Sequence, residues 1–255
     1  MAERLIDIRT DEGTLDLHVH HPWGQGAWPL VLLYMDAFGI RPALAGMAER
    51  LAAGGYAVAI PNLYYRHGDF APFEPKAVVV EGPERDRFRG MIASISPAMI
   101  MRDTAVVFDR LDAEPVVRRG ACAAVGYCMG GGYALTAAGT FPDRVVAAAS
   151  FHGGSLATDK PDSPHRVAPS MRARVYVGAA ADDPTFPPEQ ASRLRAALEA
   201  AGVAHVMETY EGTRHGFAVT GHLAYNPEAS ERHWQVLMTL LRDTLGNPDE
   251  APVGH

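Results

Sequence analysis

The chain has 255 residues, of which 47% are hydrophobic and 21% charged, and its formal net charge is -7 at pH 7. This acidic balance argues against nucleic acid as a partner, because phosphate binding needs clustered Lys and Arg. No apolar run reaches membrane-spanning length, and the first residues lack the long apolar core of a signal peptide. Two cysteines, Cys122 and Cys128, are too few for a disulfide scaffold, so we expect a protein of the reducing cytoplasm.

Apolar runs that predict strands alternate with amphipathic stretches that predict helices. In chain order, the expected strands are 15–20 (at a sheet edge), 29–35, 56–60, 121–125, 144–151, 173–178 and 204–210. The expected helices are 42–53, 98–111, one opening at 129, 188–201 and 229–245. Residues 64–90 are expected to be irregular and 246–255 to form a tail. Alternation without a linker predicts a single α/β domain over 1–255, with a mostly parallel sheet covered by helices on both faces.

The most informative motif is Gly126-Tyr127-Cys128-Met129-Gly130, which follows one of the apolar runs. It has the pattern Gly-x-nucleophile-x-Gly, which places a nucleophile on a tight turn from strand to helix. The small flanking residues relieve crowding at that turn. The alternative is that Cys128 is only a small buried side chain, as free cysteines often are.

Several reactive side chains directly follow predicted strands, at the end of the sheet where ligands bind in such folds. They are Asp36, Cys128, His152, the adjacent pair Asp182 and Asp183, and His215. A cysteine attacks a carbonyl carbon as thiolate, so it needs an imidazole to take its proton and benefits from a helix N-terminus. His215 is the best candidate base, and either Asp183 or Asp182 could orient it. Turn formation and helix capping are the alternatives for these acids.

Together, four segments resemble the dienelactone hydrolase family (carboxymethylenebutenolidase), whose fold is that of the α/β-hydrolases. The segments are Gly-Tyr-Cys-Met-Gly-Gly at 126–131, Asp-x-x-Phe-Pro-Pro at 183–188, Arg-His-Gly-Phe at 214–217 and Met-Asp-Ala-Phe-Gly at 35–39. The similarity extends from about residue 15 to residue 245. The cysteine at the turn is its most specific element, because serine is usual elsewhere in the superfamily.

The resemblance implies a catalytic triad of Cys128, Asp183 and His215. Asp183 is preferred to Asp182 because the family's acid stands four residues before a proline. The resemblance also implies an oxyanion hole made by the backbone amides of Met129 and Ala37.

A further implied role concerns Asp36, which stands where family members usually carry a Glu that engages the resting thiol. We therefore expect Asp36 to be a thiol-gating acid. The alternatives are that the shorter side chain weakens this role, or that it only binds backbone amides.

The substrate expected from this resemblance is a small-molecule ester or lactone. Family members that act on dienelactone carry an arginine soon after the Phe of the His-loop, whereas this chain has Ala-Val-Thr at 218–220. Dienelactone itself is therefore less expected than a related compound. Basic residues of the irregular segment could compensate for the missing arginine or could be solvated: Arg85, Arg87 and Arg89. Possible pocket residues, for which packing is the alternative role, are Tyr64, Tyr65, His152 and Phe217.

The sequence thus predicts a cysteine-dependent hydrolase that forms a covalent thioester and needs no cofactor. No metal is expected at His18, His20 and His21, because they lack the spacing of a ligand set. One alternative is a ligand-binding protein of the same fold that has lost catalysis. Another is a thioesterase or a C–C hydrolase on the same framework.

Overall fold

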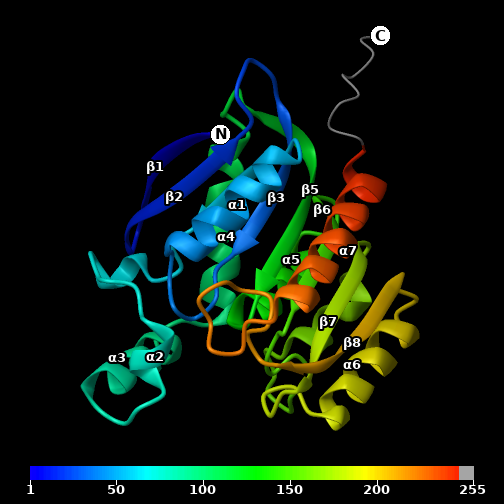
Figure 1. Cartoon of the computed structure of the whole chain (residues 1–255). Helices are drawn as coiled ribbons and strands as arrows, with labels where there is room; N and C mark the ends of the chain where they lie inside the picture. Colours follow the sequence, from blue (N-terminus) through cyan, green and yellow to red (C-terminus); the bar gives the residue numbers. More distant parts are fainter. Residues whose placement is uncertain (247–255) are drawn as a thin grey trace.

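A computed structural model describes residues 1–246 of the chain, so the predicted tail lies outside the described residues except for Gly246. All eight strands form one sheet in the order β1-β2-β4-β3-β5-β6-β7-β8 (Figure 1). The strands are β1 (Ala2–Thr10), β2 (Gly13–His21), β3 (Trp28–Tyr34), β4 (Ala57–Pro61), β5 (Val117–Tyr127), β6 (Val145–Phe151), β7 (Arg174–Asp182) and β8 (His205–Arg214). β2 is antiparallel to both β1 and β4, and the remaining pairs are parallel. The prediction of a mostly parallel α/β sheet is confirmed.

Helices cover both faces of this sheet (Figure 1). They are α1 (Pro42–Ala53), α2 (Pro75–Val78), α3 (Pro83–Ala93), α4 (Pro97–Leu111), α5 (Met129–Thr140), α6 (Pro188–Ala200) and α7 (Pro227–Leu245), with two 3-10 segments, η1 (Tyr65–His67) and η2 (Pro164–Ser170). α1 and α7 lie on one face, where the Arg50 guanidinium donates two hydrogen bonds of 2.7 Å to the Glu231 carboxylate. α4 and α5 pack against each other on the opposite face.

Local sequence explains where the long helices begin. The Ser96 hydroxyl accepts the Met99 amide at 3.3 Å and starts α4, and the Asn226 side chain accepts the Ala229 amide at 3.1 Å and starts α7. Both helices carry proline at their first position, where no amide hydrogen is needed. The central strands β3 and β4 are buried almost throughout, which is why they read as continuous apolar runs.

Two elements differ from the sequence-based expectation. Residues 15–20 are not at the sheet edge, because β1 pairs with β2 along its whole length. β1 was missed because it buries little apolar surface, mainly Ile6 and Ile8, and leaves Leu5 exposed. The segment 64–90 is also not wholly irregular, since it contains α2 and most of α3. Only Met91 of α3 is buried, so its apolar periodicity is weak.

Among residues 1–246, no single helix is long and apolar enough to cross a membrane. The pair α3 and α4 meets the criteria of length and composition only when the two helices are joined across a bend of 70°.

Candidate active site

Cys128 occupies the turn between β5 and α5, with φ 53° and ψ -121°. This conformation is costly for a residue that carries a side chain. The turn can form because the residues two positions before and after Cys128 are glycines. A Cβ on Gly126 would lie 2.0 Å from the Gly130 carbonyl oxygen, and one on Gly130 would lie 2.4 Å from the Tyr34 carbonyl oxygen. Cys128 is partly exposed at the N-terminus of α5, where the helix dipole favours an anion. Cys122 is fully buried, and burial raises the pKa of its thiol to about 12.

His215 and Asp183 meet at the ends of β8 and β7. The His215 Nδ1 donates to the Asp183 Oδ2 at 2.7 Å. The other carboxylate oxygen accepts the Thr185 hydroxyl at 2.6 Å and the Thr185 amide at 2.9 Å. Burial alone would raise the pKa of Asp183, but His215 and Thr185 together lower it. Asp182, the alternative acid, is exposed at the end of β7. The geometry therefore pairs Asp183 with the histidine.

The Cys128 sulfur acts electrostatically on the His215 imidazole. Burial by itself would lower the pKa of His215, but the electrostatic interaction with Cys128 and the hydrogen bond to Asp183 outweigh it and raise the pKa to about 10. The arrangement is therefore suited to a thiolate beside an imidazolium, with a carboxylate behind the imidazolium.

Both side chains line a cavity of about 570 Å³. Ala37 and Met129 line it as well, and within residues 1–246 neither of their backbone amides donates to a protein acceptor. Those two amides are thus available to bind an oxyanion. Much of the remaining wall is apolar and includes Phe38, Phe88, Ile92, Ile95 and Tyr133.

Asp36 has a different partner from the one that the resemblance implies. Its Oδ1 and Oδ2 accept the two terminal nitrogens of Arg41 at 2.6 and 2.7 Å, and Oδ1 also accepts the Phe38 amide at 3.0 Å. None of the hydrogen bonds in the described part of the chain joins Asp36 to Cys128. Because Arg41 engages both oxygens, this geometry does not support the expected gating role.

The four residues expected in the pocket do not line the Cys128 cavity. Three of them lie buried behind it. Tyr64 donates its hydroxyl to the Ala37 carbonyl at 3.1 Å, and the His152 ring packs edge-on against His215 and Phe217, with centroids 5.2 and 5.4 Å apart. These contacts support the loops that carry the site. A position at the end of a strand, as for His152, is therefore not sufficient to place a side chain in the cavity.

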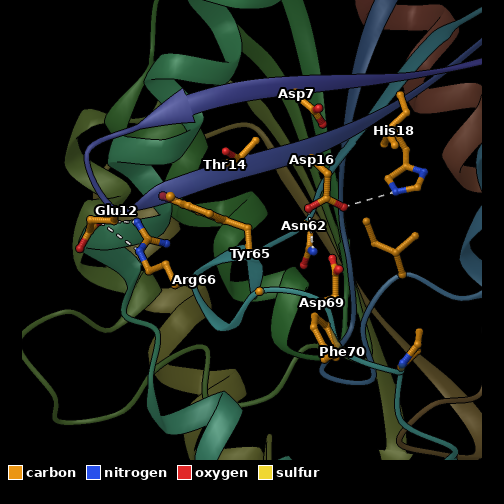
Figure 2. Close-up of a pocket in the computed structure, with 15 residues that line it drawn as sticks. Asp7, Glu12, Thr14, Asp16, His18, Asn62, Tyr65, Arg66, Asp69 and Phe70 are labelled. Carbon is orange, nitrogen blue, oxygen red and sulfur yellow. Dashed lines mark hydrogen bonds and ion pairs between the residues drawn. The ribbon is translucent and has the colours of Figure 1, made fainter.

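The fourth, Tyr65, points into a separate pocket of about 680 Å³ between η1 and the β1–β2 hairpin (Figure 2). Its hydroxyl is within 3.0 Å of both the Thr10 hydroxyl and the Asp103 carboxylate. That pocket shares no lining residue with the Cys128 cavity.

The arginines of the segment 64–90 also lie away from the Cys128 cavity. Arg87 binds Glu84 and lies 3.9 Å from the ring centroid of Phe73. Arg85 is 3.7 Å from Glu81, and Arg89 is exposed. They therefore do not replace the arginine that the His-loop lacks.

Three residues of the site were missed by sequence reasoning: Arg41, Thr185 and His222. The spacing Asp-x-Thr is typical of a turn in which a carboxylate binds the backbone two residues on, so Thr185 had a detectable signal. Arg41 and His222 had none, because each reaches the site through the path of a loop. His222 lines the cavity from the loop between β8 and α7.

Comparisons with known proteins identify the family and the fold of the chain. Residues 15–245 match the dienelactone hydrolase family. A Synechocystis protein, assigned provisionally as a carboxymethylenebutenolidase, is 26% identical over 244 residues, covering 94% of this chain and 96% of its own length. The carboxymethylenebutenolidase of Pseudomonas sp. strain P51 is 29% identical over 126 residues, covering 49% of this chain and 50% of its own length. The crystal structure of a Klebsiella pneumoniae protein, assigned provisionally as a dienelactone hydrolase, superposes with a TM-score of 0.82 at 21% identity, covering 94% of this chain and 97% of that one.

Proposed function

The chain belongs to the dienelactone hydrolase family of ester- and lactone-cleaving hydrolases, and on that premise we propose that it acts through Cys128 as a covalent nucleophile. The observation that carries the proposal is the hydrogen bond of 2.7 Å between His215 Nδ1 and Asp183 Oδ2, in a histidine that shares a cavity with a cysteine on a strained turn. This arrangement supports the proposal, because His215 has an acid to orient it and lines the same cavity as the proposed nucleophile.

In the proposed first half-reaction, the Cys128 thiolate attacks the scissile carbonyl carbon. The carbonyl oxygen becomes an oxyanion that the amides of Ala37 and Met129 stabilise. When the tetrahedral intermediate collapses, the C–O bond breaks and the His215 imidazolium gives its proton to the leaving alkoxide. The products of this step are a thioester and an alcohol, which stays tethered if the substrate is a lactone.

In the second half-reaction, neutral His215 takes a proton from water as the water attacks the thioester. Collapse of this second intermediate releases the carboxylic acid and returns the sulfur as thiolate, with the proton again on His215. Asp183 holds the ring so that the same nitrogen serves in both steps. The net reaction consumes one water per ester bond and requires no cofactor.

The substrate is proposed to be a small ester or lactone with an apolar body, because aromatic and aliphatic side chains make up much of the cavity wall. Asp36 and Arg41 are proposed to anchor the loop that presents the Ala37 amide. We also propose that the described residues act as one domain, since all eight strands share a sheet, and that the protein works in the reducing cytoplasm, where a free thiol stays reduced.

The rival of a different class is a catalytically silent ligand-binding protein. It is disfavoured because the proposed nucleophile, the proposed base and two available amides line one cavity, and the proposed acid is hydrogen-bonded to the base. A thioesterase or a C–C hydrolase would use the same groups, so only a substrate panel separates these reactions from ester cleavage.

The test measures turnover of p-nitrophenyl esters, enol-lactones and acyl thioesters by the wild type, Cys128→Ala and the matched control Cys122→Ala. Removing a catalytic nucleophile typically costs about 10⁴-fold or more in kcat, so we expect that loss in Cys128→Ala only. Iodoacetamide should label Cys128 and spare the buried Cys122. Full turnover in Cys128→Ala would refute the proposal. A wild type that is inert on the whole panel yet binds an ester saturably would favour the binding protein.

A further inference from the structure

His222 occupies a defined place between two parts of the active site. It comes from the loop between β8 and α7, drawn in orange in Figure 1, and lines the same cavity as Cys128. Its ring packs edge-on against Phe38, with centroids 5.7 Å apart, and Phe38 directly follows Ala37. On another side the ring lies against Gly216, where a Cβ would come within 2.2 Å of the imidazole. His222 is therefore held between the neighbour of an oxyanion donor and the neighbour of the base.

The hydrogen bonding of His222 fixes which ring nitrogen carries the proton. Nδ1 accepts the Ala224 backbone amide at 3.1 Å, so the neutral ring must bear its hydrogen on Nε2. Burial and the positive charge of nearby His215 lower the pKa of His222 to about 4, so the ring is neutral at pH 7. Within residues 1–246, Nε2 makes no hydrogen bond. It therefore offers a fixed, uncharged donor, and the ring that carries it lines the cavity.

We propose that His222 is a substrate-binding residue whose Nε2–H donates to a second oxygen of the substrate, one close to the scissile carbonyl. This inference rests on the proposed hydrolase function and narrows its substrate class. The ester or lactone should carry an ether, keto or carboxylate oxygen near the reacting carbon, because His222 lines the same cavity as Cys128. The rest of the molecule should be apolar, because Phe38 and Phe88 stack on each other at 5.2 Å in the wall beside His222.

Two substitutions, His222→Gln and His222→Asn, each replace the function of one of the two ring nitrogens. The amide nitrogen of Gln reaches about as far as Nε2, so His222→Gln keeps a donor for the cavity. The amide of Asn reaches about as far as Nδ1, so His222→Asn keeps an acceptor for the Ala224 amide and loses the cavity donor. A purely structural role predicts that Asn is the better replacement, and a substrate-binding role predicts that Gln is.

The experiment compares two isosteric esters, p-nitrophenyl methoxyacetate and p-nitrophenyl butyrate, which differ by one ether oxygen in place of a methylene. The quantity measured is the ratio of their kcat/KM values, because intrinsic reactivity cancels between enzyme variants. A net hydrogen bond is worth about tenfold, so this ratio should fall about tenfold in His222→Asn and stay within about twofold of wild type in His222→Gln. An unchanged ratio in Asn, or a loss in Gln alone, would overturn the proposal.

A measurement on the wild type keeps the proposal testable if either variant fails to fold, as judged by thermal unfolding. Its preference for the methoxyacetate should exceed the ratio of the two esters' hydroxide-catalysed rates. A preference equal to that ratio would contradict an oxygen-binding donor. Failure of the hydrolase proposal is distinguishable, because Cys128→Ala would then cleave both esters as fast as the wild type does.

Discussion

The pocket beside the β1–β2 hairpin and the Cys128 cavity differ in what their polar groups do. In the pocket beside the β1–β2 hairpin, several charged groups bind neighbouring side chains: Arg66 binds both Glu12 and Asp103, and the Asp16 carboxylate accepts from Asn62. Figure 2 shows Arg66 beside Glu12 and Asn62 beside Asp16. In the Cys128 cavity the arrangement is the reverse. A partly exposed thiol lines a space of about 570 Å³, together with two backbone amides and an imidazole nitrogen that make no hydrogen bond within residues 1–246.

The difference shows that volume is a poor guide to chemistry. The hairpin pocket is larger, at about 680 Å³, but Glu12 and Arg66 form an ion pair in it and the Asp16 carboxylate is bound by Asn62. The Cys128 cavity is smaller and retains unsatisfied donors beside a strained backbone turn. Unsatisfied polar groups and strain persist only where surrounding structure supports them, and both concentrate at functional sites.

The largest expected effect separates Asp183 from its neighbour in sequence. Loss of the triad acid leaves the imidazole in the wrong tautomer and typically costs about 10⁴-fold in kcat, so Asp183→Asn should lose activity on this scale. Asp182→Asn, which alters an exposed carboxylate one residue away, should stay within about twofold of wild type because surface substitutions have small effects. Steady-state kinetics on one ester suffices. A larger loss in Asp182→Asn would reassign the acid.

A second expected effect compares buried and exposed members of ion pairs. The Asp36 side chain is 2% exposed, and its partner Arg41 is 9% exposed. Removing one partner of a buried ion pair leaves the other charge buried and unpaired. Arg41→Met should therefore lower the unfolding free energy by about 3 kcal/mol. In the hairpin pocket, Glu12 is 46% exposed, and Glu12→Gln should cost no more than about 1 kcal/mol.

The same pair of variants tests the proposed role of the loop that Asp36 anchors. Arg41→Met should also lower kcat about tenfold to a hundredfold, since a misplaced oxyanion donor loses part of its effect. Glu12→Gln should leave kcat unchanged, because Glu12 lies outside the Cys128 cavity. Denaturant unfolding and kinetics on the same samples measure both. If Arg41→Met destabilised the fold with full kcat, Asp36 and Arg41 would have only a structural role.

The sequence indicates where a side chain lies most directly when its position along a strand decides the outcome. Cys128, Asp183 and His215 each follow a parallel strand, and the carboxyl ends of those strands meet at one edge of the sheet, which is why the structure brings them together. The sequence gives no indication of a side chain's position when the path of a loop determines it. Arg41 and His222 reach their partners through turns that no periodicity encodes, and β1 and α3 bury too few apolar side chains to show a pattern.

The effect of pH on folding stability should have opposite signs in the two regions. Beneath Cys128, His233 accepts the Tyr127 hydroxyl at 2.9 Å, and burial lowers its pKa to about 3. Beside the hairpin pocket, the hydrogen bond to Asp16 outweighs burial and raises the pKa of His18.

Below pH 6.5, His233 is protonated in the unfolded chain but stays neutral in the folded chain. Folding stability therefore falls as the pH drops, by about 1.4 kcal/mol per pH unit at most. For His18 the folded chain binds the proton more tightly, so its contribution is full below pH 6.5 and is lost as the pH rises through the raised pKa. Between pH 8 and pH 5, His233→Gln should therefore become less destabilising relative to wild type, by up to about 2 kcal/mol. His18→Gln should become more destabilising over the same range, by a few tenths of a kcal/mol. Urea unfolding at the two pH values measures this. Shifts of the same sign in both variants would show that the two histidines do not differ in the way their surroundings indicate.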